Sequence, residues 1–418
     1  MSTQSPAMDA ARSADRIESD IEALSGPKYT TTDEAIRRYA YTQAYRNTLD
    51  YFTRALEELG FEVYEDAVGT LVARNRPRGE PVFGLGSHCD SNRNGGKYDG
   101  TLGVVCALEV CRLSAELGLD LPLQVIAFLE EEGSGFGQML LGSRIIAQRV
   151  TQEELESFTA IDDGRPFFEH ARDAGYEPER WTESLEVLQD LIGWIELHIE
   201  QGRVLQDTQK RLGVVNAIAG YVHGDVWIDG RADHAGATPM GFRVDAGAIA
   251  AEIILELEQL ATRAGNGTVG TVGEIEFSPS LINVVPGGAR LSVDVRGVDE
   301  DAYRGVARDI AAFAEESAAR RGAKARFVQR QVMPPTPMDD RIVAALTRAA
   351  EATSEPFITM PSGAAHDTMC VADHKSTAMV FVPCKDGISH SPAEDSDTRD
   401  AALAAAVILG AVRELAGS

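Results

Sequence analysis

The sequence has little of three features that would place it in a familiar class. Its 418 residues include only five cysteines, an odd number that argues against a disulfide framework and favours a reducing compartment. It has 39 Lys and Arg against 65 Asp and Glu, a net charge of −26, which argues against a basic face for nucleic acid. No apolar run approaches the roughly 18 residues of a membrane helix, and the start MSTQSPAMDAARSADRIESD lacks the apolar core of a secretion signal. We therefore expect a cytoplasmic protein without nucleic-acid or membrane partners.

The sequence does contain a regular alternation of strand and helix patterns. Buried strands such as VFGLGS and LPLQVIAFL alternate with helices, which predicts an α/β domain with a mostly parallel sheet. Residues 214–328 follow a different order, β-α-β-β-α-β, typical of a self-contained α+β sandwich. A chain of this length commonly forms two domains. We predict one domain of residues 1–213 and 329–418, with residues 214–328 inserted as a second.

Local signals near the start predict four features. Residues 1–30 are polar, and we expect them to be frayed in part. Thr31 and Glu34 have the spacing of a helix capping box. Thr42 is positioned to cap a helix that runs to Leu59 and ends at Gly60. FEVYED and TLVARN form the pattern of a β-hairpin.

The stretch HCDSNRNGGKYDG follows a buried strand and gathers an imidazole, two carboxylates and three glycines. His88 and Asp90 lie two residues apart and are expected to point the same way, so Asp90 can orient the ring for a metal. Asp99 follows a flexible glycine turn, so its carboxylate can fold back. The alternative is an ordinary surface loop rich in Asp, Asn and Gly. The stretch alone favours neither interpretation.

Adjacent glutamates follow the next strand, at a sheet edge where ligands bind in α/β proteins. One of two neighbouring glutamates can bind metal while the other takes a proton from water. Glu130, Glu131 and Glu132 repel one another unless a cation lies between them, which favours a metal over a plain charged loop.

Two further histidines lie in polar motifs, His198 in ELHIEQG and His390 in GISHSPAE. Each alone is explained as well by a structural or exposed histidine. Together the candidates give a mixed nitrogen and oxygen set that suits two divalent ions, zinc, manganese or cobalt, with one bridging carboxylate. This ligand set is His88, Asp99, Glu132, His198 and His390.

Seven motifs in order carry a family resemblance: GSHCDSNRNGGKYDG, EEEGSGFGQMLLGSR, ELHIEQG, RADHAGATPM, NVVPGGARLSVDVR, SGAAHD and FVPCKDGISHSPAE. With them the chain resembles, from about residue 30 to 415, the N-carbamoyl-L-amino-acid hydrolases and allantoate amidohydrolases, relatives of the aminoacylase and carboxypeptidase metallohydrolases. The resemblance implies a metallopeptidase-like catalytic domain with an inserted lid and dimerisation domain. It further implies hydrolysis of the C–N bond of an N-carbamoyl or similar N-acyl L-amino acid by a homodimer.

The resemblance also assigns roles to single residues of the larger domain. His88, Glu132, His198 and His390 are implied metal ligands, with Asp99 as the bridging carboxylate. Asp90 would orient His88. Glu131 would act as the general base that deprotonates a metal-bridging water and then protonates the leaving nitrogen.

The remaining implied residues contact the substrate. His234 would polarise the scissile carbonyl, and Asn283 and Arg296 would grip the substrate carboxylate. Gln201 and His366 are implied substrate contacts. The residues alone allow plainer interpretations, a turn histidine for His234 and an exposed strand cation for Arg296.

Five positions depart from the usual family pattern, none of them an implied metal ligand, so the expected effect is on substrate preference. They are Ser91, Arg93, Gly135, Ala237 and Ala365.

Several alternatives stay open. Allantoate, ureidoglycolate or β-ureidopropionate hydrolysis and N-acyl-amino-acid amidase activity would use the same chemistry. A non-catalytic α/β binding protein would not need Glu131 beside Glu132, and a peptidase would need an open groove. A thiol enzyme is disfavoured because neither Cys89 nor Cys384 has an evident base nearby.

Overall fold

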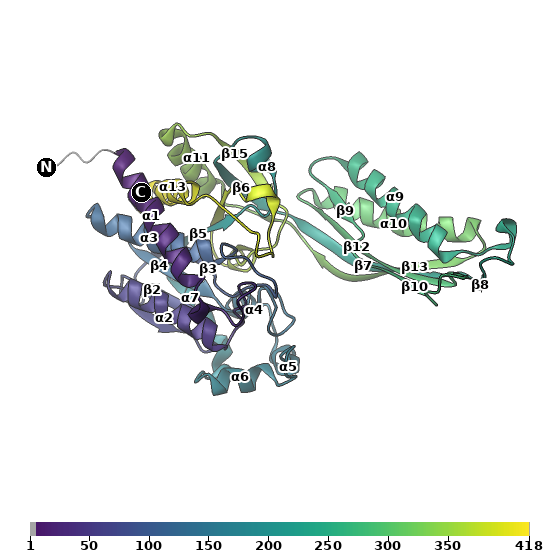
Figure 1. Ribbon diagram of the computed structural model, residues 1–418. Helices are drawn as coiled ribbons and strands as arrows, with labels where there is room; N and C mark the ends of the chain where they lie inside the picture. Colours follow the sequence, from purple (N-terminus) through teal and green to yellow (C-terminus); the bar gives the residue numbers. More distant parts are fainter. Residues whose placement is uncertain (1–5, 418) are drawn as a thin grey trace. The chain divides into compact units, whose positions relative to one another are not determined.

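The computed structural model describes residues 6–417, which form two compact units (Figure 1). Unit 1 comprises the chain up to Asn216 and from Met338 onward, and unit 2 comprises Ala217–Pro337. The sequence pattern predicted the domain boundaries at 213/214 and 328/329. In the structure the boundaries lie later, at 216/217 and 337/338, because β6 continues to Ile218 and β13 to Met333. None of the helices in the described range is both long and apolar enough to span a bilayer.

The N-terminal stretch of unit 1 is more ordered than its polar composition predicted. Residues 6–24 form helix α1 (Pro6–Leu24), which buries Ile17, Ile21 and Leu24 at helical spacing. The first five residues of the stretch that we expected to fray lie outside the described range. On the buried helix α3 (Thr101–Glu116), Glu109 forms an ion pair with Arg16 of α1, so a charge pair as well as apolar contact joins these two helices.

The two capping predictions had opposite outcomes. No helix begins at Thr31, so the predicted capping box is wrong there; Thr31 instead hydrogen-bonds the Arg37 carbonyl at 3.1 Å. Thr42 does cap α2 (Gln43–Glu57), accepting from the Tyr45 N–H at 3.3 Å, and this prediction is confirmed. A capping box does occur at Thr151, before α5 (Gln152–Ser157).

The central sheet of unit 1 is mostly parallel, as predicted, with strand order β1-β2-β4-β3-β5-β16-β6-β14 and β15 paired to β6. β3 (Val82–His88) pairs in parallel with β4 (Leu123–Phe128) and β5 (Leu191–Ile199), and β5 pairs in parallel with β16 (Thr377–Val382). The predicted hairpin is confirmed as β1 (Glu62–Glu65) and β2 (Leu71–Arg74). Because β3, β4 and β16 are buried along their whole length, they read as continuous apolar runs. The remaining strands are β6 (Leu212–Ile218), β14 (Thr336–Pro337) and β15 (Phe357–Ser362).

Helices cover this sheet and connect its parallel strands. The crossover helix α3 (Thr101–Glu116) is buried almost throughout and packs with α1 and α13 (Thr398–Ala416). The other helices of unit 1 are α4 (Leu141–Ile146), α5 (Gln152–Ser157), α6 (Phe167–Asp173), α7 (Glu186–Gln189), α8 (Val204–Asp207), α11 (Asp340–Thr353) and α12 (Thr368–Val371), with 3₁₀ turns at Pro27–Tyr29, Pro178–Leu185 and Lys385–Gly387.

Unit 2 is an antiparallel sheet covered by two helices. Its longer elements follow the predicted β-α-β-β-α-β order, and the short strands β8, β9 and β11 are additions to it. The sheet has the order β10-β12-β7-β13, and α9 and α10 pack against it. Along β12 buried residues alternate with partly exposed ones, as expected for a sheet with one covered face. The elements are β7 (Gly220–Asp229), β8 (Asp233–His234), α9 (Ala246–Ala264), β9 (Val269–Thr271), β10 (Ile275–Ser278), β11 (Val284–Val285), β12 (Gly288–Gly297), α10 (Glu300–Arg320) and β13 (Lys324–Met333), with a 3₁₀ turn at Met240–Phe242.

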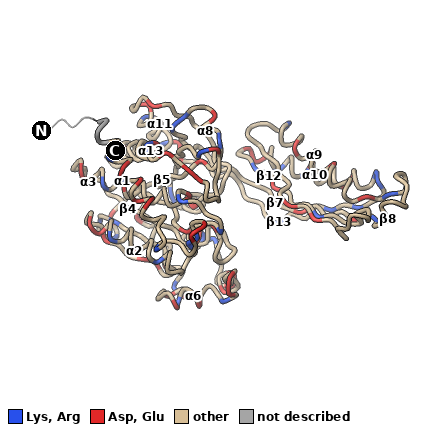
Figure 2. Tube along the Cα trace, in the orientation of Figure 1, with Lys and Arg blue, Asp and Glu red and all other residues tan. Residues whose placement is uncertain are grey.

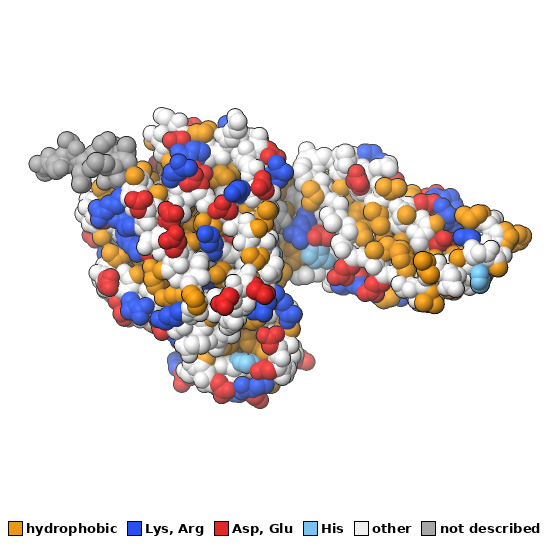
Figure 3. Space-filling model, in the orientation of Figure 1, with side chains coloured by type: hydrophobic (Ala, Val, Ile, Leu, Met, Phe, Trp, Pro, Cys, Tyr) orange, Lys and Arg blue, Asp and Glu red, His pale blue; other side chains and the backbone are white. Residues whose placement is uncertain are grey.

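Acidic and basic residues are interspersed along the backbone of both units, and the face in the space-filling view carries charged side chains of both signs among apolar ones (Figures 2 and 3). The most exposed large apolar residues of unit 2 are Met240, Phe242 and Ile282. The acidic excess is therefore spread over the chain rather than gathered in one tail.

Candidate metal centre and active site

Polar residues gather where four neighbouring strands of unit 1 end. His88 is the last residue of β3, and the three glutamates begin at Glu130, two residues after the end of β4. His198 is the penultimate residue of β5, and His390 lies in the loop after β16. Because β4, β3, β5 and β16 are adjacent and parallel, their carboxyl ends bring these side chains to one edge of the sheet.

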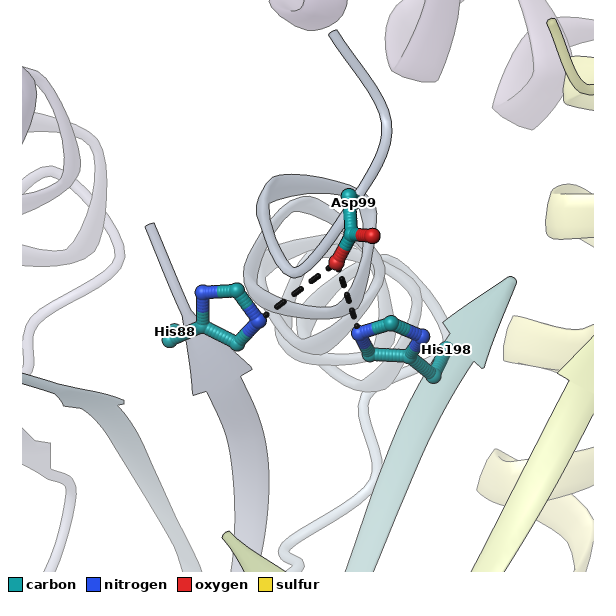
Figure 4. A group of neighbouring side chains, drawn as sticks. All are labelled: His88, Asp99 and His198. Atoms are coloured by element: carbon teal, nitrogen blue, oxygen red, sulfur yellow. Dashed lines mark ion pairs between the residues drawn. The ribbon is translucent and has the colours of Figure 1, made fainter. Parts of the chain in front are cut away.

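Asp99 lies at the centre of this group. Its Oδ1 atom is 3.1 Å from Nε2 of His198 and 3.6 Å from Nε2 of His88 (Figure 4). Its Oδ2 atom is 3.4 Å from Nε2 of His390. The two oxygens of one carboxylate therefore face different histidines.

Two groups of side chains are each close enough to hold a cation, and they share Asp99. The first is His88, Asp99 and His198, and the second is Asp99, Glu132 and His390; within each group the donor atoms lie within 4.8 Å of one another. In the second group, Oε2 of Glu132 is 3.4 Å from Nε2 of His390. All five residues that the sequence assigned as ligands are thus brought together.

Glu131 and Asp90 flank the first group. Oε2 of Glu131 is 3.5 Å from Nε2 of His88, on the ring atom that also faces Asp99. Asp90 lies 3.4 Å from Nδ1 of His88, and its two oxygens accept the backbone N–H groups of Glu131 and Glu132 at 3.0 and 3.1 Å. Asp90 therefore holds both the imidazole and the glutamate turn.

Glycines make this close arrangement possible. Gly100 has a φ of 61°, and a Cβ atom there would overlap the His88 ring. A Cβ on Gly96 would overlap the Glu394 side chain. The glycine turn brings Asp99 back to His88 because no side chain occupies that space.

The donor set fits a metal ion. His198 donates from Nδ1 to the Ile199 carbonyl at 2.9 Å, which leaves Nε2 as the coordinating atom. Oε1 of Glu132 is buried without a hydrogen-bond partner, so the network is incomplete without another group. Imidazole and carboxylate donors in this combination suit zinc, manganese or cobalt.

The pKa shifts describe a crowded set of charges. Burial, and then Asp99, raise the pKa of Glu132 to about 7. Burial raises the pKa of Glu131 well above its usual range, although His88 opposes the shift. Hydrogen bonding to Asp99 raises the pKa of His390 to about 9 despite its burial. Burial alone would raise the pKa of Asp99, but His198 and its other imidazole partners lower it strongly.

Two predicted substrate contacts of unit 1 lie beside this cluster. Gln201 donates from Nε2 to Oδ2 of Asp99 at 2.8 Å. The His366 ring packs edge-on against His198 at 4.6 Å between centroids, and its Nε2 lies 3.0 Å from Oγ of Ser362. Burial and the neighbouring His198 lower the pKa of His366 well below its usual range, so a neutral ring is favoured.

Sequence reasoning missed two polar residues of the site. Ser389 lies 2.7 Å from Oδ2 of Asp99, and Glu394 accepts the backbone N–H of Asp99 at 2.9 Å. Both lie in the motif GISHSPAE, on either side of the ligand candidate His390. The structure also explains the glycine at position 135, where the family commonly has another residue. Its N–H donates to Glu130, and a Cβ there would lie 2.9 Å from that carboxylate.

The predicted substrate residues of unit 2 lie at two ends of its sheet. His234 on β8 pairs with Val284, and the Asn283 carbonyl accepts the N–H of Ala235 at 2.9 Å. His234 and Asn283 are therefore neighbours. Nδ1 of His234 accepts the N–H groups of Gly236 and Ala237, so a neutral ring carries its proton on exposed Nε2.

Arg296 lies near the opposite end of β12, where its guanidinium forms an ion pair with Asp294 at 2.9 Å. Eight strand residues, about 27 Å, separate it from Gly288 at the end near β8. Unit 2 therefore does not bring Arg296 together with His234 and Asn283.

Comparison with known proteins agrees with this geometry. A model of peptidase family M20/M25/M40 matches residues 84–414. The chain is 38% identical to an N-carbamoyl-L-amino acid amidohydrolase of Geobacillus stearothermophilus over 91% of this chain and 93% of that protein. It is 33% identical to the allantoate amidohydrolase of Escherichia coli, with 87% and 89% covered. A solved amidase of the hydantoinase/carbamoylase family from Burkholderia multivorans superimposes with a TM-score of 0.89 at 30% identity, with 97% of this chain and 98% of that chain covered.

The fold and the site thus define a hydrolase with a candidate His/Asp metal centre. The chain belongs to peptidase family M20/M25/M40, and within it to the group of N-carbamoyl-L-amino-acid and allantoate amidohydrolases.

Proposed function

We propose that this protein hydrolyses the carbamoyl C–N bond of N-carbamoyl-L-amino acids. The observation that carries the proposal is the pair of donor groups sharing Asp99, with the carboxylate of Glu131 beside His88. The names of the relatives support the carbamoyl substrate class.

The two donor groups would hold two divalent ions, with Asp99 between them. His88 and His198 would bind one ion, and Glu132 and His390 the other. When bound, such ions supply Lewis acidity, which makes water acidic enough to be deprotonated near neutral pH. Zinc, manganese and cobalt all fit the donor types.

Glu131 would be the general base and then the general acid. Its carboxylate lies at the edge of the cluster in a buried environment that raises its pKa, so it can hold a proton during the reaction. It would take a proton from the attacking water and deliver it to the leaving nitrogen. The amino acid leaves with that proton, and the carbamic acid formed decomposes to CO₂ and ammonia.

Residues of unit 2 would complete substrate binding. Nε2–H of His234 would donate to the carbonyl oxygen as negative charge develops there. Asn283 and Arg296 would bind the substrate carboxylate, Arg296 through its planar guanidinium. Gln201 and His366 would contact the substrate from unit 1.

A homodimer accounts for the separation of these residues. A carbamoyl amino acid is far shorter than the part of β12 that separates Arg296 from the end near His234. One copy of unit 2 therefore cannot bring both Arg296 and His234 to one substrate, whereas two copies can contribute one residue each. We propose a homodimer in which the inserted domain acts as lid and dimerisation domain.

The test is a substrate screen with protein loaded with Mn²⁺ or Zn²⁺. N-carbamoyl-L-amino acids, N-acyl-L-amino acids, ureidopropionate, ureidoglycolate and allantoate are incubated together and followed by mass spectrometry. Chelator-sensitive loss of a carbamoyl amino acid is expected. Loss of acyl amino acids alone would overturn the carbamoyl assignment in favour of an amidase.

Allantoate hydrolysis is a second candidate, because a relative with that name is about as similar as several carbamoylase relatives. Its expected sign in the same screen is loss of allantoate with the carbamoyl amino acids unchanged.

A further inference from the structure

The carboxylate of Glu394 holds the backbone of the loop that carries Asp99. Its Oε1 atom accepts the N–H of Tyr98 at 2.8 Å and the N–H of Asp99 at 2.9 Å. The side chain is only 2% exposed, so these bonds are shielded from water. Glu394 lies four residues after His390 and in the same loop, which is not the loop that carries Asp99.

Ser389 lies between the other oxygen of Glu394 and the side chain of Asp99. Ser389 lies 3.2 Å from Oε2 of Glu394 and 2.7 Å from Oδ2 of Asp99. A serine hydroxyl has one hydrogen to donate, and the shorter distance favours Asp99. Gln201 donates to the same oxygen, so Asp99 Oδ2 is fixed from two sides.

The local sequence leaves space for this contact. A Cβ atom on Gly96 would overlap the Cβ, Cδ and Oε1 atoms of Glu394. The second glycine of HCDSNRNGGKYDG is thus the position at which the Asp99 loop and the His390 loop meet.

Stability alone does not explain this carboxylate. Among the residues that the structure describes, no Lys or Arg forms an ion pair with Glu394. Burial, and then Asp99, disfavour its charge. A buried carboxylate without a cation carries a desolvation cost. Its geometry, two backbone bonds beside Asp99, is therefore the feature that needs a function.

We infer that Glu394 is a positioning residue that joins the Asp99 loop to the His390 loop and so sets the orientation of Asp99 between the two donor groups. The inference rests on the proposed function for the role of Asp99 as a shared ligand. It assigns Ser389, from the same loop as Glu394, as a donor to Oδ2 of Asp99.

The test compares Glu394→Ala and Glu394→Gln with a matched control. Asp339→Ala is the control, because Asp339 also accepts two N–H groups, at 2.9 and 3.1 Å, but caps α11 near Thr377, at the opposite end of β16 from the site. Mn²⁺ alone is titrated into each metal-free protein by calorimetry, and thermal unfolding is followed without metal.

Glu394→Ala is expected to weaken Mn²⁺ binding about 10- to 100-fold, the usual effect of losing support for a ligand. Glu394→Gln keeps an acceptor for both N–H groups and is expected to restore most of the affinity. Asp339→Ala is expected to lower the melting temperature without changing Mn²⁺ affinity. With a carbamoyl substrate, the alanine variant should lower kcat more than it changes KM.

Wild-type Mn²⁺ affinity in Glu394→Ala, with a loss of melting temperature like that of the control, would overturn the inference. If that variant does not fold, Gly96→Ala decides, because it displaces an intact Glu394: weaker Mn²⁺ binding supports the inference and unchanged binding overturns it. Failure of the proposed function is separate, since it would leave the wild-type protein inactive on carbamoyl substrates without altering the metal titrations.

Discussion

The candidate metal centre of unit 1 and the core of unit 2 bury charge in different ways. Asp225 is the only buried Asp, Glu, Lys, Arg or His among the described residues of unit 2, and it forms ion pairs with Arg290 and Arg330 at 3.0 and 2.9 Å. In unit 1, carboxylates at the end of the parallel sheet are buried with other carboxylates and imidazoles instead of arginines. A buried charge with a structural role is usually paired with an opposite charge, whereas a binding or catalytic site holds like charges close together for a ligand or a reaction. The comparison therefore supports the proposal that the chemistry takes place in unit 1.

The largest expected effect comes from Glu131→Gln in unit 1. The amide cannot accept the proton of water, so we expect kcat to fall about 10³-fold or more, within the range of general base catalysis. Mn²⁺ affinity, measured by calorimetry, should stay within a few-fold of wild type. Turnover at the wild-type rate would remove Glu131 from the mechanism.

A smaller loss is expected for His234→Ala in unit 2. Removing one donor to the developing oxyanion typically costs about 10²-fold in kcat. Metal affinity should be unchanged, because His234 belongs to neither donor group. If the variant instead lost metal, unit 2 would hold part of the metal centre and the contrast between the units would fail.

Glycines give a stability comparison between the units. Gly100→Ala forces a Cβ into the His88 ring at a φ of 61°, and we expect a loss of more than about 2 kcal/mol together with weaker metal binding. Gly322→Ala in unit 2 has a φ of 72° but open space around the Cβ, so only about 1–2 kcal/mol of backbone strain is expected. Chemical denaturation measures the free energy of unfolding of both variants. Equal losses would show that the overlap with His88 does not lower stability.

The smallest effect is a pH dependence that differs between the units of the metal-free protein. Burial, and then Asp90, raise the folded pKa of Glu130 from 4.5 to about 8. A raised pKa stabilises the fold fully below pH 4.5, and this contribution is lost as the pH rises through about 8. Despite burial, His223 and Arg296 lower the pKa of Asp294 from 3.8 to about 2. Its contribution is present above pH 3.8 and is lost as the pH falls through about 2.

Hydrogen exchange of peptides from each unit, corrected for intrinsic rates, measures this difference. Unit 1 should lose protection between pH 5 and 8.5, while unit 2 should lose it only in acid. Equal loss in both units at alkaline pH would show that the buried carboxylates of unit 1 are not its weak point.

Local signals predicted much of the fold because each depends on a few neighbouring residues. The Thr42 cap, the β1–β2 hairpin and the buried strands follow from side-chain size and polarity over short windows. Helix α1 was missed because its contacts with α3 and α13 are distant in sequence, and its isolated pattern is polar. The box at Thr31 failed because residues 30–37 hydrogen-bond within their own turn.

The site was predictable as far as donor chemistry is visible in a motif. The five ligand candidates share side chains that bind metals, and the structure brings them together. Glu394 and Ser389 were not predictable in this way, because their contacts with Asp99 depend on a meeting of loops nearly 300 residues apart. The distance along β12 between Arg296 and the end near His234 likewise follows from strand register, which motif spacing does not reveal.

The position of Asp99 between two groups of donors has a thermodynamic consequence. Any two cations that use its two oxygens compete for, and share, the charge of one carboxylate, so their affinities form a single coupled equilibrium. The coupling is reciprocal: whatever factor the first cation applies to the affinity of the second, the second applies to the first. A titration of this centre would then be described by two macroscopic constants that belong to the pair, and a substitution on one side of Asp99 would change the apparent affinity of the other side without touching it.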